Sequence, residues 1–102
     1  MRQWLFAAGV MVALAGCSAG SGKTGAELFA THCAGCHPDG GNTIRPTRTL
    51  KAADRHANGL RNARDIAGYI RNPGQGMPAF PVGMIPPDDA LKIGEYILSR
   101  FK

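Results

Sequence analysis

The strongest constraint on this chain is the run Cys-Ala-Gly-Cys-His at residues 33–37. Two thiols three positions apart can reach the two vinyl groups on one edge of a porphyrin and become thioethers. The imidazole of His37 then lies beside the iron and can ligate it as a neutral base. A fold that uses Cys33 and Cys36 in this way must form around a large, flat, apolar porphyrin ring.

Paired cysteines also occur in redox dithiols and in zinc sites. The immediate histidine and the absence of a second cysteine pair downstream argue against both. The chain has three cysteines, and Cys17 has a separate role discussed below, so no thiol remains for a disulfide. The sequence therefore predicts one covalently attached haem c.

A candidate for the second axial ligand lies in the loop Gly-Gln-Gly-Met-Pro-Ala-Phe at residues 74–80. The soft thioether of Met77 suits iron, and His/Met ligation raises the reduction potential relative to bis-His ligation. Pro73 and Pro78 restrict the loop on both sides, which is unusual for a methionine that only fills a gap in a core. Met84, in a second proline-flanked loop, is the competing candidate.

The N-terminal residues have the pattern of a processing segment. Residues 1–16 combine a basic Arg2 with an apolar stretch too short to cross a bilayer, as in a signal peptide. Residues 14–17, Leu-Ala-Gly-Cys, resemble the bacterial lipobox, which implies that cleavage makes Cys17 the N-terminus and that Cys17 carries lipid. An ordinary secretory signal with an incidental cysteine is the alternative.

This interpretation divides the chain into a signal peptide at 1–16, a lipidated cysteine with a flexible tether at 17–23, and one domain at 24–102. Several acyl chains together anchor a protein stably in a membrane. Ser18 follows the lipidated cysteine, and the similarity to Gram-negative lipoproteins then implies the outer membrane. The expected localisation is the cell envelope, with the domain facing the periplasm or the exterior.

The size of the domain and the charge of the chain limit the classes of function that fit this sequence. A domain of about eighty residues is small for one hydrophobic core, and a haem would supply a large apolar core element. The chain carries 12 Lys and Arg against 7 Asp and Glu. No nucleic-acid-binding module accompanies these cations, so they are expected to contact haem propionates, steer an acidic redox partner or face solvent. Most of them are concentrated in the middle of the chain: Arg45, Arg48, Lys51, Arg55, Arg61, Arg64 and Arg71.

The hydrophobic periodicity and the turn residues predict an all-α domain. Helices are expected from Gly25 to about Cys33, from Thr49 to Asn58, from Asn62 to about Arg71, and from Pro87 to the C-terminus. No alternating apolar run indicates a strand. The turn residues of segments 38–42 and 72–74 end the first and third helices.

Two glycines suggest how the helices pack. Gly25 and Gly94 lie near the aromatic residues Phe29 and Tyr96, and helices approach closely where side chains are small. The first and last helices are therefore expected to cross at these glycines. His32 is expected to point to solvent.

Together these motifs resemble those of the small monohaem class I cytochromes c. The matching segments are Gly25-Ala26-Glu27-Leu28-Phe29, residues 33–37, Gly40-Gly41-Asn42, Pro46, Thr49-Leu50, Met77-Pro78-Ala79-Phe80 and Tyr96. With the lipobox, the chain is also similar to the outer-membrane lipoprotein cytochromes of metal-reducing bacteria. The resemblance implies a class I cytochrome c fold, with three to four short helices wrapped around one haem.

The same resemblance implies roles for individual residues. Cys33 and Cys36 would form the thioethers, with His37 as the proximal and Met77 as the distal ligand. Pro46 would lie against the His side of the haem, where a nearby backbone carbonyl can accept the imidazole N–H. Tyr69 occupies a place where family members often carry a Gln that faces the haem, and it is a candidate haem contact.

The expected function is one-electron transfer between redox partners in the cell envelope. With both axial positions filled, the iron has no open site for a small-molecule substrate, so no enzymatic activity is expected. Other redox proteins, cytochromes among them, are the expected partners, and the lipid anchor provides contact with the membrane. The alternatives are a haem-based small-ligand sensor or weak peroxidase, acting through a labile Met77, and a structural lipoprotein that needs haem only to fold.

Overall fold

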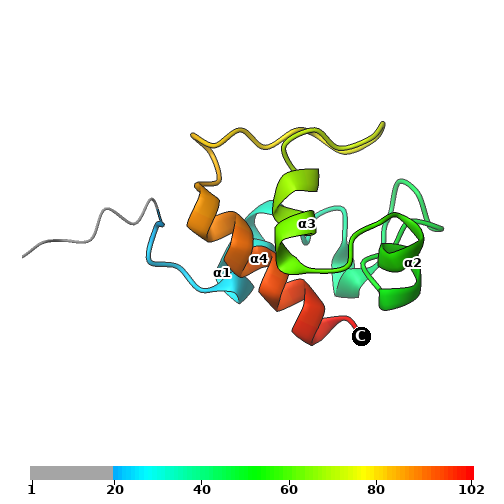
Figure 1. Ribbon diagram of the computed structural model, residues 1–102. Coiled ribbons are helices and arrows are strands. Elements are labelled where there is room, and N and C mark those ends of the chain that lie inside the picture. The colour runs from blue at the N-terminus through cyan, green and yellow to red at the C-terminus, as the bar shows by residue number, and fades with distance from the viewer. Residues whose placement is uncertain (1–19) are drawn as a thin grey trace, which may run out of the picture.

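The computed structural model describes residues 20–102, and this part of the chain contains four α-helices, one 3₁₀ turn and no strand (Figure 1). The all-α prediction is confirmed. The predicted signal peptide and Cys17 lie outside the described residues. Within residues 20–102, no helix has the length and apolar character needed to cross a bilayer. The elements are α1 (Gly25–His32), η1 (Pro38–Gly40), α2 (Ala52–Ala57), α3 (Ala63–Tyr69) and α4 (Pro87–Arg100).

Side-chain caps explain where two of the helices begin. At α1, Thr24 Oγ1 accepts a hydrogen bond from the Glu27 backbone N–H at 3.2 Å, and Glu27 Oε1 accepts one from the Thr24 N–H at 3.3 Å. This reciprocal pair is a capping box, which satisfies two N–H groups that the first helical turn leaves without partners. Asn62 caps α3 in the same way as Thr24, with its Oδ1 accepting from the Asp65 N–H at 2.8 Å.

The predicted start of α2 is wrong by three residues. Thr49 lies before the helix, and its N–H and Oγ1–H both donate to Asp54 Oδ2, at 2.9 and 2.6 Å. This side-chain bond competes with helix formation and holds residues 49–51 as a loop. The helix therefore begins only at Ala52.

Helix α4 is the centre of the packing. Its apolar face contacts α1 on one side and α3 on the other (Figure 1). Phe29 of α1 packs against Tyr96 and against Phe101, with ring centroids 5.3 and 5.4 Å apart. The other buried hydrophobic residues complete one core: Leu28, Cys33, Ile66, Ile70, Phe80, Ile85, Ala90, Ile93 and Ile97.

The two glycines contact different helices, which corrects one expectation. A Cβ on Gly25 would lie 2.5 Å from the Lys92 carbonyl oxygen, so α1 does approach α4 closely at this residue. A Cβ on Gly94 would instead lie 2.7 Å from the Ala63 carbonyl oxygen, at the start of α3. Gly94 therefore accommodates α3 and not α1, and α4 uses separate close contacts for its two neighbours.

The chain enters the domain beside the first turn of α4. The Ser21 N–H donates to Asp89 Oδ1 at 3.0 Å, and Lys92 Nζ donates to the Lys23 carbonyl oxygen at 3.2 Å. Burial raises the pKa of Asp89, but the hydrogen bonds from Ser21 and the nearby Lys92 and Lys23 more than offset this, so its pKa lies below the ordinary value. Residues 20–23 are thus held on α4 at the end of the molecule away from α2 (Figure 1).

The packing at Gly94 can be tested with a matched pair of substitutions. We expect Gly94→Ala to destabilise the protein by about 2 kcal/mol, because backbone atoms of Ala63 cannot move away from a methyl group without cost. Gly68→Ala in α3 should raise stability by about 0.5–1 kcal/mol, because no atom lies within 4 Å of its added Cβ and Ala favours a helix. Guanidinium unfolding at equal haem loading measures both, and a Gly94→Ala protein as stable as Gly68→Ala would contradict the packing.

Candidate functional site

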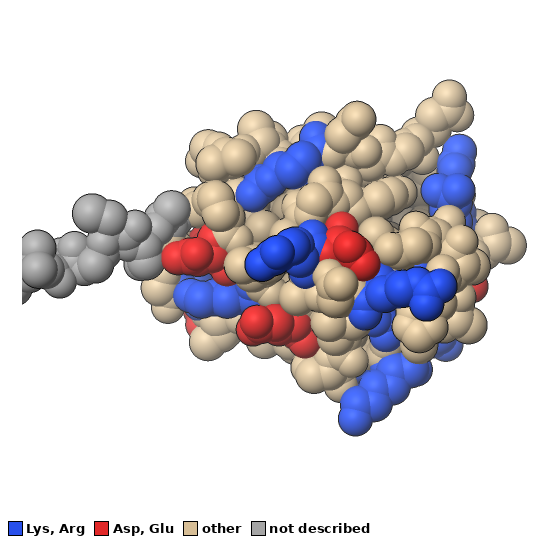
Figure 2. Space-filling view, in the orientation of Figure 1, with Lys and Arg blue, Asp and Glu red and all other residues tan. Residues whose placement is uncertain are grey.

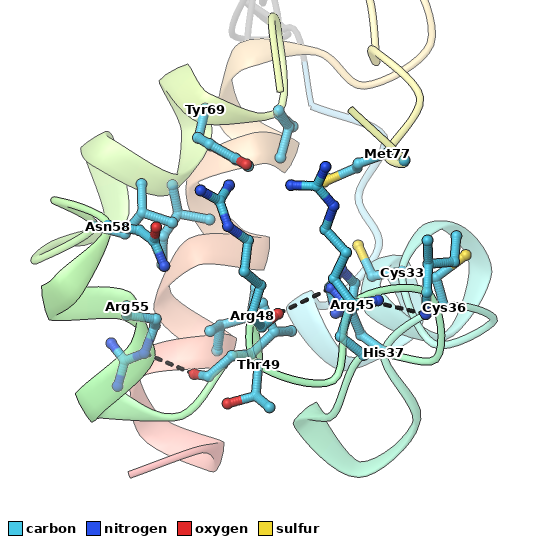
Figure 3. A pocket seen from close by; sticks show the side chains of 18 of the residues that line it. Cys33, Cys36, His37, Arg45, Arg48, Thr49, Arg55, Asn58, Tyr69 and Met77 are labelled. Atoms are coloured by element: carbon cyan, nitrogen blue, oxygen red, sulfur yellow. Dashed lines mark hydrogen bonds between the residues drawn. The ribbon is translucent and has the colours of Figure 1, made fainter. Parts of the chain in front are cut away.

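A deep apolar cavity lies between α1, α3, α4 and the loops around residues 42–50 and 74–80 (Figure 3). The space enclosed by its walls, including the part open to solvent, is about 1070 Å³. Its inner walls are formed by core side chains: Leu50, Leu60, Ile66, Ile70, Phe80, Ile93 and Ile97.

Both motif cysteines line this cavity, directly after α1. The helix continues into a turn in which the Cys36 and His37 N–H groups both donate to the Cys33 carbonyl oxygen, at 3.2 and 2.9 Å. Burial raises the pKa of the Cys33 thiol to about 11. A redox dithiol needs an accessible thiolate at neutral pH, so this environment is unsuited to disulfide exchange.

His37 is buried on the same wall, and one of its ring nitrogens has a backbone partner. Its Nδ1 lies 2.7 Å from the Gly41 carbonyl oxygen. Because a carbonyl only accepts, Nδ1 carries the proton, and Nε2 of the neutral ring keeps its lone pair for a metal. The resemblance implied a carbonyl acceptor near Pro46, but Pro46 is exposed and does not line the cavity. The acceptor belongs to Gly41.

The loop after η1 is organised by a residue whose role the sequence analysis missed. Asn42 Oδ1 accepts from the N–H groups of Ile44 and Arg45, at 3.0 and 2.7 Å, and Asn42 Nδ2 donates to the Arg48 carbonyl oxygen at 2.9 Å. Such Asx turns are a common use of Asn. The turn places Arg45 and Arg48 along the cavity (Figure 3). The Gly-Gly-Asn run at residues 40–42 is the sequence pattern that could have predicted this turn.

Met77 and Tyr69 reach the cavity from the side opposite His37 (Figure 3). Met77 is half-buried and packs against the core, whereas Met84 is 55% exposed and does not line the cavity. The Tyr69 hydroxyl accepts from the Gly74 N–H at 3.4 Å, which connects α3 with the loop that carries Met77. Of the two methionines considered, the structure brings Met77 to the site.

His32 differs from its expected position. It is half-buried and lines the cavity, and its ring meets that of Phe80 edge-on, with the centroids 6.0 Å apart. The start of the loop after Met77 is therefore packed against the last turn of α1. His56, by contrast, is exposed.

Arg55 was expected only as one of the central basic residues, and it proves to be a buried part of the cavity wall. Its side chain is 3% exposed, with Nε donating to the Leu50 carbonyl oxygen at 2.7 Å and Nη2 to the Phe101 carbonyl oxygen at 2.9 Å. Its Nη1 is buried and has no hydrogen-bond partner within residues 20–102.

The donor set of the cavity fits a covalently held haem. Two thiols and an imidazole with a free Nε2 lie on one part of the wall, and a thioether faces them. Apolar side chains line the interior, and Arg45 and Arg48 along the cavity are cations that can meet carboxylates. These are the groups that the vinyl substituents, the iron, the ring and the propionates of a haem require.

Comparison with known proteins gives the same result. Residues 20–97 match the family model described as cytochrome c oxidase, cbb3-type, subunit III. Cytochrome c6 of Cyanidium caldarium is 36% identical over 76 residues, which cover 74% of this chain and 68% of the relative. The chain belongs to the class I c-type cytochromes. Like its relatives, this cytochrome binds one covalent c-type haem.

Solved structures show the same fold. The outer membrane cytochrome OmcF of Geobacter sulfurreducens is 68% identical, with a TM-score of 0.76 over 76% of this chain and 99% of that chain. Cytochrome c6C of a Synechococcus strain is 31% identical, with a TM-score of 0.68 over 76% and 93% of the two chains. The predicted class I cytochrome c fold is confirmed. The relatives are electron carriers, so the coarse assignment of this cytochrome is haem-based electron transfer.

The hydrogen bonds at Thr49 predict an acid-sensitive contribution to stability. The Thr49 Oγ1–H and N–H donate to Asp54 and hold the pKa of its carboxyl below the ordinary value. A lowered folded-state pKa stabilises the fold above the unfolded value of about 3.9, and this contribution is lost as pH falls through the folded-state pKa.

We therefore expect Asp54→Asn to be less stable than the parent at pH 7, with the difference shrinking as the pH falls through the folded-state pKa of Asp54. Denaturant unfolding of both proteins from pH 7 to pH 2 measures the difference. Asp88→Asn, at an exposed carboxylate, is the control. A stability difference for Asp54→Asn that does not change with pH would contradict the assignment.

Proposed function

We propose that this cytochrome is a one-electron carrier in which Cys33 and Cys36 would hold the haem and His37 and Met77 would ligate its iron. The observation that carries the proposal is the convergence of these four side chains on one apolar cavity (Figure 3). When bound, the haem supplies Fe(III)/Fe(II) exchange. The protein's residues set the ligands, the polarity and the access around it.

Each part of the wall has a task in this function. The Gly41 carbonyl holds the His37 ring in one orientation and raises the basicity of the liganding nitrogen. The isoleucines of α3 and α4 keep water from the inner edge of the site. A closed coordination sphere in an apolar site favours outer-sphere electron transfer and leaves no position for a substrate.

Redox partners are proposed to approach at the mouth of the cavity. Ile44 is 54% exposed there, and Arg45 and Arg48 flank it. Figure 2 shows Lys and Arg side chains at the end of the molecule that carries α2 and the loop before it. An exposed apolar residue with cations around it suits a redox protein whose docking surface is acidic, because complementary charge speeds encounter.

We further propose that Cys17 is lipidated and tethers the domain to the outer membrane. The lipobox-like sequence supports this, as does the name of the similar protein OmcF, an outer membrane cytochrome. Only Ser18 and Ala19 separate Cys17 from Gly20, and residues 20–23 are held on α4. Such a short connection would keep the first turn of α4 near the membrane and α2 away from it (Figure 1).

The choice of axial ligand is tested by a pair of methionine variants. Met77→Ala should give a high-spin iron, a lower reduction potential and rapid binding of carbon monoxide to the ferrous protein, because one coordination position opens. Met84→Ala should keep the parent spectrum and potential, since Met84 is exposed and outside the cavity. Optical spectra and redox titration measure both variants.

The reverse pattern would assign the ligand to Met84. Rapid binding of carbon monoxide to the unmodified protein at neutral pH would reject the closed iron site and favour the ligand-sensing or peroxidase alternative. A weak sulfur-to-iron band at the red end of the visible spectrum of the ferric protein is the expected parent signature.

The anchor is tested by intact-mass spectrometry of the protein purified from membranes of a host that matures haem c. The parent mass should include the haem and the acyl groups, beginning at Cys17. Cys17→Ala should retain the haem mass and lose the acyl mass, and Ser18→Ala should retain both. If the parent protein carries no acyl mass, the proposed lipid anchor is contradicted, but the assignment as an electron carrier is not affected.

A further inference from the structure

Four large hydrophobic side chains are exposed within residues 20–102, and three of them lie on α4 or on the loop that leads into it. Val82 and Met84 are each 55% exposed and Leu91 is 36% exposed, whereas the fourth, Ile44, lies at the mouth of the haem cavity. A single exposed hydrophobic residue is ordinary, but a group of them marks an interaction site. We call Val82, Met84 and Leu91 the apolar patch.

The apolar patch borders an open hollow between α3 and the first turns of α4. Two arginines, Arg64 and Arg71, contribute to its walls. The remaining lining residues are apolar or glycine: Ala67, Gly68, Val82, Pro87, Ala90 and Leu91. The hollow and the patch thus form one mostly apolar surface with cations beside it.

Hydrogen bonds hold the loop of the apolar patch against α3. Arg71 Nη1 donates to the Phe80 and Ile85 carbonyl oxygens, at 3.0 and 2.7 Å. These two carbonyls flank the segment that carries Val82 and Met84. The patch is therefore presented by a fixed loop, so covering it costs little additional conformational entropy.

The chain enters the domain at the same end of the molecule. A Cβ on Gly20 would lie 3.4 Å from Asp88 Cβ, in the first turn of α4, and Figure 1 shows the entering chain and the loop before α4 at one end. Gly20 lies three residues after Cys17. Because three extended residues span at most about 11 Å, a lipid on Cys17 would bring the bilayer surface close to this turn.

We propose that the apolar patch rests on the phospholipid surface that holds the lipid anchor. This inference rests on the proposed lipidation of Cys17. Val82, Met84 and Leu91 enter the boundary between headgroups and acyl chains, where apolar side chains flanked by cations bind membranes. Arg64, which is exposed beside the hollow, pairs with lipid phosphate groups while its aliphatic stem stays on the apolar surface.

The charges at this end favour a bilayer over a charged partner protein. Lys23 and Arg64 are exposed cations, but Asp88 is an exposed acid in the first turn of α4. Mixed charge gives little steering toward a strongly acidic or basic protein. Apolar contact beside an acyl anchor therefore carries the interaction, and it gives the domain one orientation in which Ile44, at the α2 end, stays clear of the membrane (Figure 1).

The direct test uses the lipidated, haem-loaded protein in nanodiscs of phosphatidylethanolamine and phosphatidylglycerol that include a lipid with a gadolinium-chelating headgroup. Methyl NMR is recorded on the ferrous protein, whose haem is diamagnetic. Because paramagnetic broadening falls steeply with distance, the methyl signals of Val82, Met84 and Leu91 should be lost while that of Ile44 remains. Equal broadening at Ile44 and at the apolar patch would overturn the proposal.

The second test separates the apolar patch from the tether. With Val82→Gln and Leu91→Gln together, the Met84 methyl signal should recover most of its intensity, because the domain can turn away from the bilayer. The Gly20 amide signal should stay broadened, since the tether is intact. Ala53→Gln, at an exposed site on α2, should keep the parent pattern. A Met84 signal that is broadened equally in the parent and in the double variant would contradict the inference.

Intact mass separates this inference from the proposed anchor. If acyl mass is present and Met84 and Ile44 are broadened equally, only the membrane contact of the patch fails. If acyl mass is absent, the anchor fails and the patch inference fails with it, while the carrier assignment stands. Concentration-dependent shifts of the patch methyl signals in the unlipidated Cys17→Ala protein would assign the patch to a second copy of the chain and overturn the proposal.

Discussion

The rest of the structure depends on apolar contact with the group that fills the central cavity. Helices α1, α2 and α3 are each eight residues or shorter, and helices of that length are marginal in water without tertiary packing. Ile66, Ile70 and Ile93 belong to the core and also line the cavity. The protein core and the haem site therefore share walls, so cofactor binding and folding stabilise each other.

Because the protein core and the haem site share walls, residues of the haem site also help to hold the fold together. The carbonyl that orients His37 comes from the segment that ends η1, and Arg55 joins the loop before α2 to the end of α4. Both interactions use backbone groups that the loops would otherwise leave without partners. In a domain this small, ligand geometry is set by loops that carry few apolar contacts and rely on such bonds.

The two ends of the molecule have different roles in the proposed function. Residues 20–23 are attached to the first turn of α4, through bonds to Asp89 and from Lys92. The exposed Ile44 and its neighbouring arginines lie at the cavity mouth. An anchor at one end and a docking surface at the other would let a tethered carrier meet partners at high effective concentration without turning its haem toward the membrane.

From the sequence alone, one could predict the features that depend on residues lying close together along the chain. Residues 33–37 predicted the covalent haem, and local sequence patterns predicted the starts of α1 and α3 to within one residue, because these signals act within one or two turns. Only the tertiary structure decided which distant groups meet: Gly41 rather than Pro46 beside His37, α3 rather than α1 at Gly94, and the carbonyls of Leu50 and Phe101 around Arg55. These contacts follow from how loops and helices fold back on one another, and no local pattern in the chain specifies that.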